Sequence, residues 1–103
     1  MLALLLVLTM GAGSPARADG DRVKGEALAK RICALCHVIG DHNRMGGIDS
    51  TPSFPLMAKR PDIFAHRIPT FQQRRPHPQF QWSISIQDIA DLESYIQSLS
   101  VKK

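Results

Sequence analysis

Apolar side chains recur with the 3.6-residue period of an α-helix in two segments, one near each end of the chain. The stripe within residues 21–35 consists of Val23, Ala27, Leu28 and Ile32. The stripe within residues 85–99 consists of Ile89, Leu92, Ile96 and Leu99. Tyr95 lies beside the second stripe, and Ser85 at its start is a residue type that favours the helix N-cap. Since no segment alternates apolar and polar residues as strands do, we predict an all-α fold.

Two shorter helical segments are predicted in the middle of the chain. Ser53 is a candidate N-cap for a helix that ends at Lys59. Residues 61–68 form a further helical segment, and Pro69 ends it or begins the next loop. The stretches around these two segments are rich in Gly, Asp, Asn or Pro and are predicted loops.

The first residues have the composition of a secretory signal peptide. Residues 2–7 are apolar, and Ala16-Arg17-Ala18 is an A-x-A cleavage site before Asp19. We therefore predict a signal peptide over residues 1–18 and one mature domain over residues 19–103. No Lys or Arg precedes the apolar run, which departs from the usual pattern and leaves an uncleaved anchor as the alternative. That run is shorter than the about 20 residues that span a bilayer, so export followed by cleavage is favoured and no membrane span is expected afterwards.

The composition limits the class of partner. The chain has 13 Lys and Arg against 9 Asp and Glu, a formal net charge of +4, which falls to +3 when Arg17 leaves with the signal peptide. This modest charge, without a dense basic stripe carrying aromatic residues, argues against nucleic-acid binding. The mature domain of 85 residues is small enough that a large apolar cofactor would supply much of its core.

The chemistry is concentrated in Cys33-Ala34-Leu35-Cys36-His37, a C-x-x-C-H motif that holds the only two cysteines of the chain. Such a motif is typical of covalent haem attachment. On helical turns, residues three apart face the same side, so the two sulfurs can reach two neighbouring vinyl groups of one macrocycle. His37 then follows as an iron ligand.

Three alternatives to haem attachment fit the motif less well. A thiol–disulfide redox pair is typically found in a βαβ context, of which the sequence shows no sign. A structural zinc site needs four ligands, and no second Cys-x-x-Cys follows. A plain structural disulfide would leave His37 without a role.

With this motif near its start and a helix at its end, the mature chain resembles the class I c-type cytochromes, small exported electron carriers. The resemblance implies a small domain whose N- and C-terminal helices cross, with short helices and loops around one covalent haem c and its iron. It also implies that Tyr95 packs against Gly25 where the two helices cross. Covalent haem attachment of this type takes place outside the bacterial cytoplasm, so the implied location is the periplasm.

Two further residues gain a role from this resemblance. Thr51-Pro52-Ser53-Phe54 looks like the family's loop in which a proline carbonyl accepts the second ring N–H of the proximal histidine. Pro52 would then fix the tautomer of His37. Trp82 would donate its indole N–H to a haem propionate, or it packs beneath the last helix.

The sequence departs from the family at the sixth iron ligand, where a methionine usually precedes the last helix. The irregular, basic stretch Thr70–Trp82 contains no methionine and has His77 between two prolines instead. We favour His77 as the ligand, which would give a haem with two histidines. Met57, or less readily Met45, is the alternative, and His66 is a lesser rival. The last possibility is an open sixth site with Phe80 in place of the methionine.

The resemblance implies a non-enzymatic carrier that shuttles single electrons between periplasmic redox proteins, as a monomer or as a subunit of a redox complex. The alternatives are a five-coordinate haem protein that binds a gas or peroxide, and the electron-transfer subunit of a larger dehydrogenase or oxidase. Arg67, Arg74 and Arg75 could form a basic rim that steers an acidic redox partner.

Overall fold

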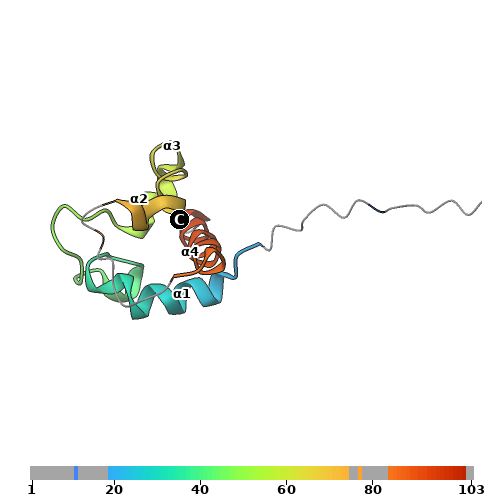
Figure 1. Ribbon diagram of the computed structural model, residues 1–103. Coiled ribbons are helices and arrows are strands. Elements are labelled where there is room, and N and C mark those ends of the chain that lie inside the picture. Colours follow the sequence, from blue (N-terminus) through green and yellow to red (C-terminus); the bar gives the residue numbers. More distant parts are fainter. Residues whose placement is uncertain (1–10, 12–18, 75–76, 78–83, 102–103) are drawn as a thin grey trace, which may run out of the picture.

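The computed structural model describes residues 11, 19–74, 77 and 84–101 of the chain. Over these residues the secondary structure is helical and includes no strand, which confirms the predicted all-α class. The α-helices are α1 (Arg22–Arg31), α2 (Phe54–Lys59), α3 (Pro61–Phe64) and α4 (Ile86–Ser98). Single turns or short runs of 3-10 helix connect and extend them: η1 (Cys33–Leu35), η2 (Asp41–Asn43), η3 (Ile68–Gln73) and η4 (Leu99–Val101). Figure 1 shows α1 and α4 crossing, with α2 and α3 on the far side of α4 from α1.

The first helix starts and stops for local reasons. The Asp21 carboxylate accepts hydrogen bonds from the backbone N–H groups of Val23 and Lys24, so it satisfies two of the amides that a helix start leaves free. The α-helix ends at Arg31, and the chain tightens into the 3-10 turn η1. The helix predicted over residues 21–35 is therefore interrupted just before the C-x-x-C-H motif.

The crossing of α1 and α4 depends on two glycines. A Cβ atom on Gly20 would lie 1.8 Å from the carbonyl oxygen of Ala90, and one on Gly25 would lie 1.9 Å from that of Asp91. Both distances are far below van der Waals contact, so only glycine lets the two backbones approach this closely. This result favours a packing role for Gly25, and it confirms the expected crossing of the terminal helices.

The crossing also decides which face of α1 is buried. Its buried residues are Gly25, Leu28 and Ala29, whereas Val23 is 66% exposed and Ala27 is also exposed. The predicted stripe was therefore wrong for Val23 and Ala27. The physical reason is that the glycine face, which carries little hydrophobicity of its own, is the one that meets α4.

The α4 atoms nearest to Gly25 belong to the backbone of Asp91 and Leu92, and the described contacts of Tyr95 lie elsewhere. The α4 backbone itself occupies the space against Gly25. The Tyr95 hydroxyl instead donates a 2.7 Å hydrogen bond to the carbonyl oxygen of Ile39, and it lies beside Gly40. This hydrogen bond therefore connects α4 to the segment that follows the C-x-x-C-H motif.

The hydrophobic core lies between α1, α4 and the segments that follow the motif. Ile39 and Phe54 bring the loop and the start of α2 into this core. The buried members are Leu28, Ala29, Ile39, Phe54, Leu92, Tyr95, Ile96 and Leu99. Partly buried side chains pack around them: Ile32, Cys33, Ala34, Met57, Ala58, Ile68 and Phe71. The predicted face of the last helix is thus confirmed at Leu92, Tyr95, Ile96 and Leu99, while Ile89 is only half-buried.

The short central helices match the prediction in part. The Ser53 hydroxyl accepts a hydrogen bond from the Leu56 N–H, so Ser53 caps α2 as predicted, and α2 ends at Lys59. However, α3 ends at Phe64 instead of Ile68. Pro69 neither ends a helix nor begins a loop, because it lies in the first turn of η3, where a missing N–H costs nothing. The stretch predicted to be irregular begins at Thr70, whose non-helical backbone angles (φ −119°, ψ 16°) kink η3.

The predicted signal peptide, residues 1–18, lies outside the described residues except for Gly11, which is exposed. Within the part of the chain that is described, no helix combines the length and apolar character needed to cross a membrane.

Candidate cofactor and metal site

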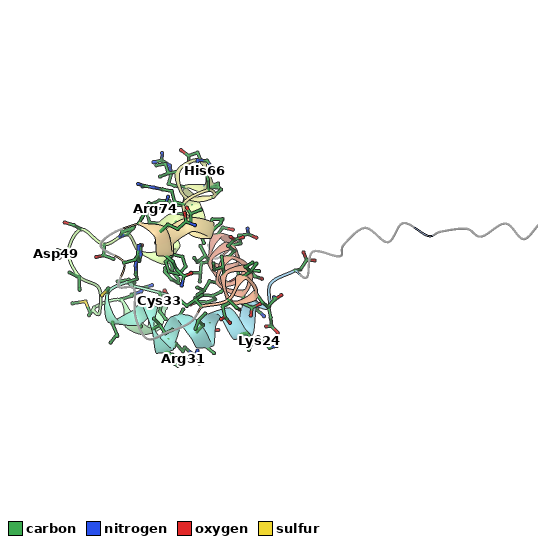
Figure 2. The ribbon with its side chains drawn as sticks, viewed as in Figure 1. Lys24, Arg31, Cys33, Asp49, His66 and Arg74 are labelled. Atoms are coloured by element: carbon green, nitrogen blue, oxygen red, sulfur yellow. The ribbon has the colours of Figure 1, made fainter. Side chains whose placement is uncertain are left out.

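The C-x-x-C-H motif forms one tight turn. The Cys33 carbonyl accepts hydrogen bonds from the N–H groups of Cys36, at 3.1 Å, and His37, at 2.8 Å. The turn keeps the two cysteines and the histidine within one loop of chain directly after α1. Figure 2 shows Cys33 in this turn, on the inner side of the molecule and facing the segment that carries Arg74.

The two cysteines are half-buried free thiols, so the structure contains no disulfide between them. Burial, with a smaller contribution from the neighbouring Cys36, raises the pKa of Cys33 to about 11. A thiol with such a pKa is protonated at neutral pH and is a poor nucleophile for disulfide exchange. The environment therefore argues against the redox-pair alternative.

His37 is held by one of its ring nitrogens. Its Nδ1 lies 2.7 Å from the carbonyl oxygen of Pro52, the contact implied by the family resemblance. Because a carbonyl oxygen can only accept, Nδ1 carries the proton and Nε2 keeps its lone pair for a metal. Burial lowers the pKa of His37, which outweighs the opposing effect of the Pro52 hydrogen bond. Its imidazole is thus neutral, the form that ligates metals.

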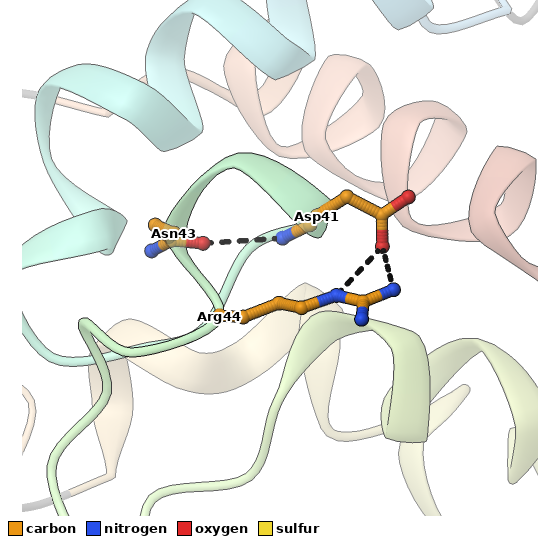
Figure 3. Close-up of polar contacts among 4 residues, drawn as sticks. Asp41, Asn43 and Arg44 are labelled. Carbon is orange, nitrogen blue, oxygen red and sulfur yellow. Dashed lines mark hydrogen bonds and ion pairs between the residues drawn. The ribbon is translucent and has the colours of Figure 1, made fainter.

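Asn43 fixes the backbone around this histidine. Its side-chain oxygen accepts hydrogen bonds from the N–H groups of Ile39, at 2.8 Å, and Gly40, at 3.3 Å, while its amide nitrogen donates to the His37 carbonyl at 2.9 Å. Figure 3 shows Asn43 beside the exposed ion pair of Asp41 and Arg44, whose Nη2 and Oδ1 atoms are 3.0 Å apart. The exposed pair contributes little to stability, whereas the three bonds of Asn43 define the path of the chain after His37.

His77 faces His37 across the site. The centres of the two imidazole rings lie 6.1 Å apart, and their planes differ by 9°. The Nδ1 atom of His77 lies 3.2 Å from the carbonyl oxygen of Arg74. When Nδ1 donates to this carbonyl, the Nε2 atom is left with a free lone pair, as in His37. The structure thus brings together the two histidines that the sequence analysis named as iron ligands.

Each histidine is also supported by a phenylalanine. The ring of Phe54 lies 5.5 Å from that of His37, at an angle of 48°. The ring of Phe71 lies 5.2 Å from that of His77, at 69°, which is an edge-to-face contact. Phe54 in turn lies 6.3 Å from Tyr95. Aromatic rings therefore run from η3, through the two histidines, to α4.

The rival ligands are placed less favourably. Met45 is 97% exposed, and His66 is also exposed; Figure 2 shows His66 at the outer end of the molecule. Met57 is half-buried against the core and stays the alternative to His77. Arg75, Phe80 and Trp82 lie outside the described residues. No cluster of three or more His, Cys, Asp or Glu suited to a metal ion occurs among the described residues.

Sequence reasoning missed two residues of this site. Asn43 was read only as part of a polar loop, and its position six residues after His37 gives no signal that it would bond to three backbone groups. Phe71 falls in the stretch predicted to be irregular, and no local sequence signal indicates the 3-10 turn that positions it.

The residues present fit a haem, which the C-x-x-C-H motif would hold. The rings of His37 and His77 lie 6.1 Å apart and nearly parallel, and each imidazole would offer its Nε2 lone pair to an iron ion. The two free thiols and the neutral His37 next to them supply the other groups that such a cofactor needs.

The chain is 34% identical over 97 residues to cytochrome c-552 of Bradyrhizobium diazoefficiens, a match that covers 93% of this chain and 91% of the relative. No family model matches the chain, and no solved structure matches it.

Proposed function

The chain belongs to the class I c-type cytochromes, and we propose that it shuttles single electrons between redox proteins of the periplasm. Its cofactor is covalently bound haem c with iron, and its general role is electron transport. The iron, when bound, supplies the one-electron redox change. The protein's own residues hold, orient and shield the group that carries the electron.

In this proposal the C-x-x-C-H motif holds the haem. Cys33 and Cys36 form the two thioether bonds, and His37 binds the iron on the proximal side. The Pro52 carbonyl, 2.7 Å from the Nδ1 atom of His37, sets the tautomer that presents Nε2 to the metal. Asn43 supports the same histidine through its backbone carbonyl.

We assign the second axial position to His77. The observation that carries this assignment is the near-parallel pair of imidazoles, with ring centres 6.1 Å apart and planes at 9°. The second support is that both rings have Nδ1 beside a backbone carbonyl, so that both Nε2 atoms are free to bind. Met57 is the alternative ligand.

Two imidazole ligands have a functional consequence. They leave the haem potential lower than one imidazole and one thioether do. A filled sixth position also keeps the iron low-spin, with little change of geometry on reduction, which suits outer-sphere electron transfer and not the binding of a gas or peroxide. The expected role is therefore that of a low-potential carrier without an enzymatic reaction of its own.

The partners and the location complete the proposal. Residues 1–18 direct export and are cleaved before Asp19, which places the mature domain in the periplasm.

Arg67 is exposed and Arg74 is half-buried, and the guanidinium of Arg74 donates to the Arg67 carbonyl, so both lie together near His77. This basic rim would attract an acidic redox partner, and the effect would weaken with added salt.

The test of the iron ligands is a pair of optical and electron-spin spectra for the wild-type protein and the His77→Ala variant. We expect a low-spin wild type without the far-red band of methionine ligation, and a high-spin variant. His66→Ala is the control, because His66 is exposed and its removal should leave the spectra unchanged.

Three other outcomes would contradict the assignment. An unchanged spectrum for His77→Ala would exclude His77 as the ligand. A methionine band in the wild type would indicate Met57, and its loss in Met57→Leu would establish that residue. A high-spin wild type that binds carbon monoxide readily when reduced would favour a five-coordinate haem protein.

A further inference from the structure

We infer that Phe71 is a positioning residue for the second iron ligand: it holds the His77 imidazole nearly parallel to the His37 imidazole. This inference rests on the proposed ligation by His77. It concerns the orientation of that ligand, which is a separate property from its identity.

The first observation is the contact between Phe71 and His77. Their ring centres lie 5.2 Å apart at an angle of 69°. This edge-to-face geometry is the favoured one for aromatic pairs, because the positive edge of one ring meets the negative face of the other. The contact therefore favours one orientation of the His77 ring over others.

The second observation is that the hydrogen bond of the His77 ring is long. The Nδ1 atom of His77 lies 3.2 Å from the Arg74 carbonyl, whereas that of His37 lies 2.7 Å from the Pro52 carbonyl. The torsion that turns a histidine ring about its Cβ–Cγ bond has broad minima. A long hydrogen bond restrains that torsion weakly. The orientation of the His77 ring therefore depends more on Phe71 than the orientation of the His37 ring depends on Phe54.

The third observation is that Phe71 sits on a segment that is itself held in place. It lies within η3, packed against the core, and contacts join η3 to α4. The Arg74 N–H donates to the Phe71 carbonyl at 3.1 Å, and the His77 N–H donates to the Arg74 carbonyl at 3.1 Å. Two backbone hydrogen bonds thus link Phe71 to His77 by way of Arg74, which places both rings on connected backbone.

The consequence is specific to the electronic structure of the iron. In a low-spin ferric haem, the angle between the two imidazole planes sets the energy gaps of the iron d orbitals. Nearly parallel planes give an electron-spin spectrum with three resolved g-values, whereas strongly twisted planes give a signal dominated by one very large g-value. The g-values therefore report the angle that Phe71 is inferred to set, which is 9° between the free rings in this structure.

The experiment uses the holoprotein and compares Phe71→Leu with two other variants. Phe71→Tyr keeps the ring, and Phe64→Leu is a matched control that makes the same change at a half-buried phenylalanine of α3. We expect the wild type, Phe71→Tyr and Phe64→Leu to share the spectrum with three resolved g-values. Phe71→Leu should stay low-spin while its signal shifts toward the large-g type and broadens.

A second measurement tests how firmly His77 binds the iron. Carbon monoxide binds the reduced iron only where it displaces the sixth ligand. Loss of one aromatic pair is expected to raise the apparent carbon monoxide affinity of Phe71→Leu roughly 2- to 10-fold over the wild type. Phe64→Leu should show no such rise.

The outcomes separate this inference from the proposed ligation. If His77→Ala stays low-spin, the ligation is wrong, whatever Phe71→Leu does. If His77→Ala becomes high-spin but Phe71→Leu keeps the wild-type g-values and carbon monoxide affinity, the ligation holds and the role of Phe71 is wrong. A large-g signal in the wild type would also overturn the inference, and this measurement does not depend on the folding of any variant.

Discussion

The carbonyl oxygen of Asp91 occupies the space in which a side chain of residue 25 would begin: a Cβ atom on Gly25 would lie 1.9 Å from it. The contact places the α1 and α4 backbones side by side, and the core residues Leu28 and Leu92 lie on the same crossing. The helix that leads into the haem motif is thereby fixed against the last helix of the chain.

The first prediction concerns this crossing. Gly25→Ala should lower the free energy of unfolding by about 1–3 kcal/mol or more, because the added methyl group must push two helix backbones apart. Chemical denaturation of the holoprotein measures this change in the free energy of unfolding. Val23→Ala, on the exposed face of the same helix, should change the stability by less than about 0.5 kcal/mol. Equal effects of the two substitutions would contradict the packing role of Gly25.

The second prediction concerns the buried carboxylate of Asp91. It accepts hydrogen bonds from the Asp21 N–H at 2.7 Å and from the Gln87 amide at 3.0 Å. The Asp21 hydrogen bond, above all, lowers the pKa of Asp91 below its ordinary value, against the opposing effect of burial. The stability from Asp91 is thus fully present above the unfolded pKa of about 3.9, and is lost as the pH falls through the lower folded pKa.

Asp91→Ala tests this dependence. At pH 7 the variant should be less stable by about 1–3 kcal/mol, because the Asp21 N–H at the start of α1 loses its acceptor. Denaturation curves of wild type and variant, measured from pH 7 down to pH 2.5, should converge at the acidic end. A difference that stays constant over this range would show that the carboxylate charge does not matter.

The third prediction concerns the link between α4 and the segment after the motif. Tyr95→Phe removes the hydroxyl that donates to the buried Ile39 carbonyl at 2.7 Å and should destabilise the holoprotein by about 1–3 kcal/mol. The optical spectrum should not change, because the phenylalanine ring keeps its place beside Phe54. A spectral change would instead indicate that the hydroxyl acts on the iron site through His37.

The fourth prediction concerns Asn43. Asn43→Ala removes three hydrogen bonds to the backbone around His37, whereas Asn43→Asp keeps the acceptor for Ile39 and Gly40 but replaces the donor to the His37 carbonyl by a second oxygen. The order of stability should be wild type, then Asn43→Asp, then Asn43→Ala, with about 1 kcal/mol for each hydrogen bond. Thermal unfolding of the three holoproteins gives the order, and a variant Asn43→Ala as stable as the wild type would refute it.

The fifth prediction concerns the cofactor. A variant with both Cys33→Ala and Cys36→Ala cannot form thioether bonds. A domain of this size buries only about 60% of its unfolded surface and is marginal without added support. Circular dichroism should therefore show a largely unfolded chain. A cooperative melt with native helix content would show that the polypeptide folds without covalent haem.

The properties that the sequence predicted correctly are local ones. Ser53 caps α2 and Ser85 caps α4 because a hydroxyl at that position bonds to an amide three residues on, whatever the rest of the fold does. The C-x-x-C-H motif is likewise contained in five residues. The family resemblance added the contact between His37 and the Pro52 carbonyl, which spans 15 residues and which spacing alone would not reveal.

The properties that the sequence did not predict depend on contacts between distant segments. Periodicity assigned Val23 to the buried face of α1, because it counts hydrophobic side chains and gives no weight to a glycine. The close approach of α4 turned the Gly25 face inward instead. In the same way, Pro69 suggested a boundary, while packing of Ile68 and Phe71 against the core favoured a 3-10 helix there.

The sequence by itself determined the attachment motif, the helical class and the N-caps of α2 and α4, because these follow from neighbouring residues and from side chains one turn apart. The tertiary structure alone decided which face of α1 is buried, what Asn43 and Phe71 do, and how His77 lies relative to His37. The reason is physical: the angle and the distance between the rings of His37 and His77 are set by packing between segments far apart in the chain, and no local pattern encodes them.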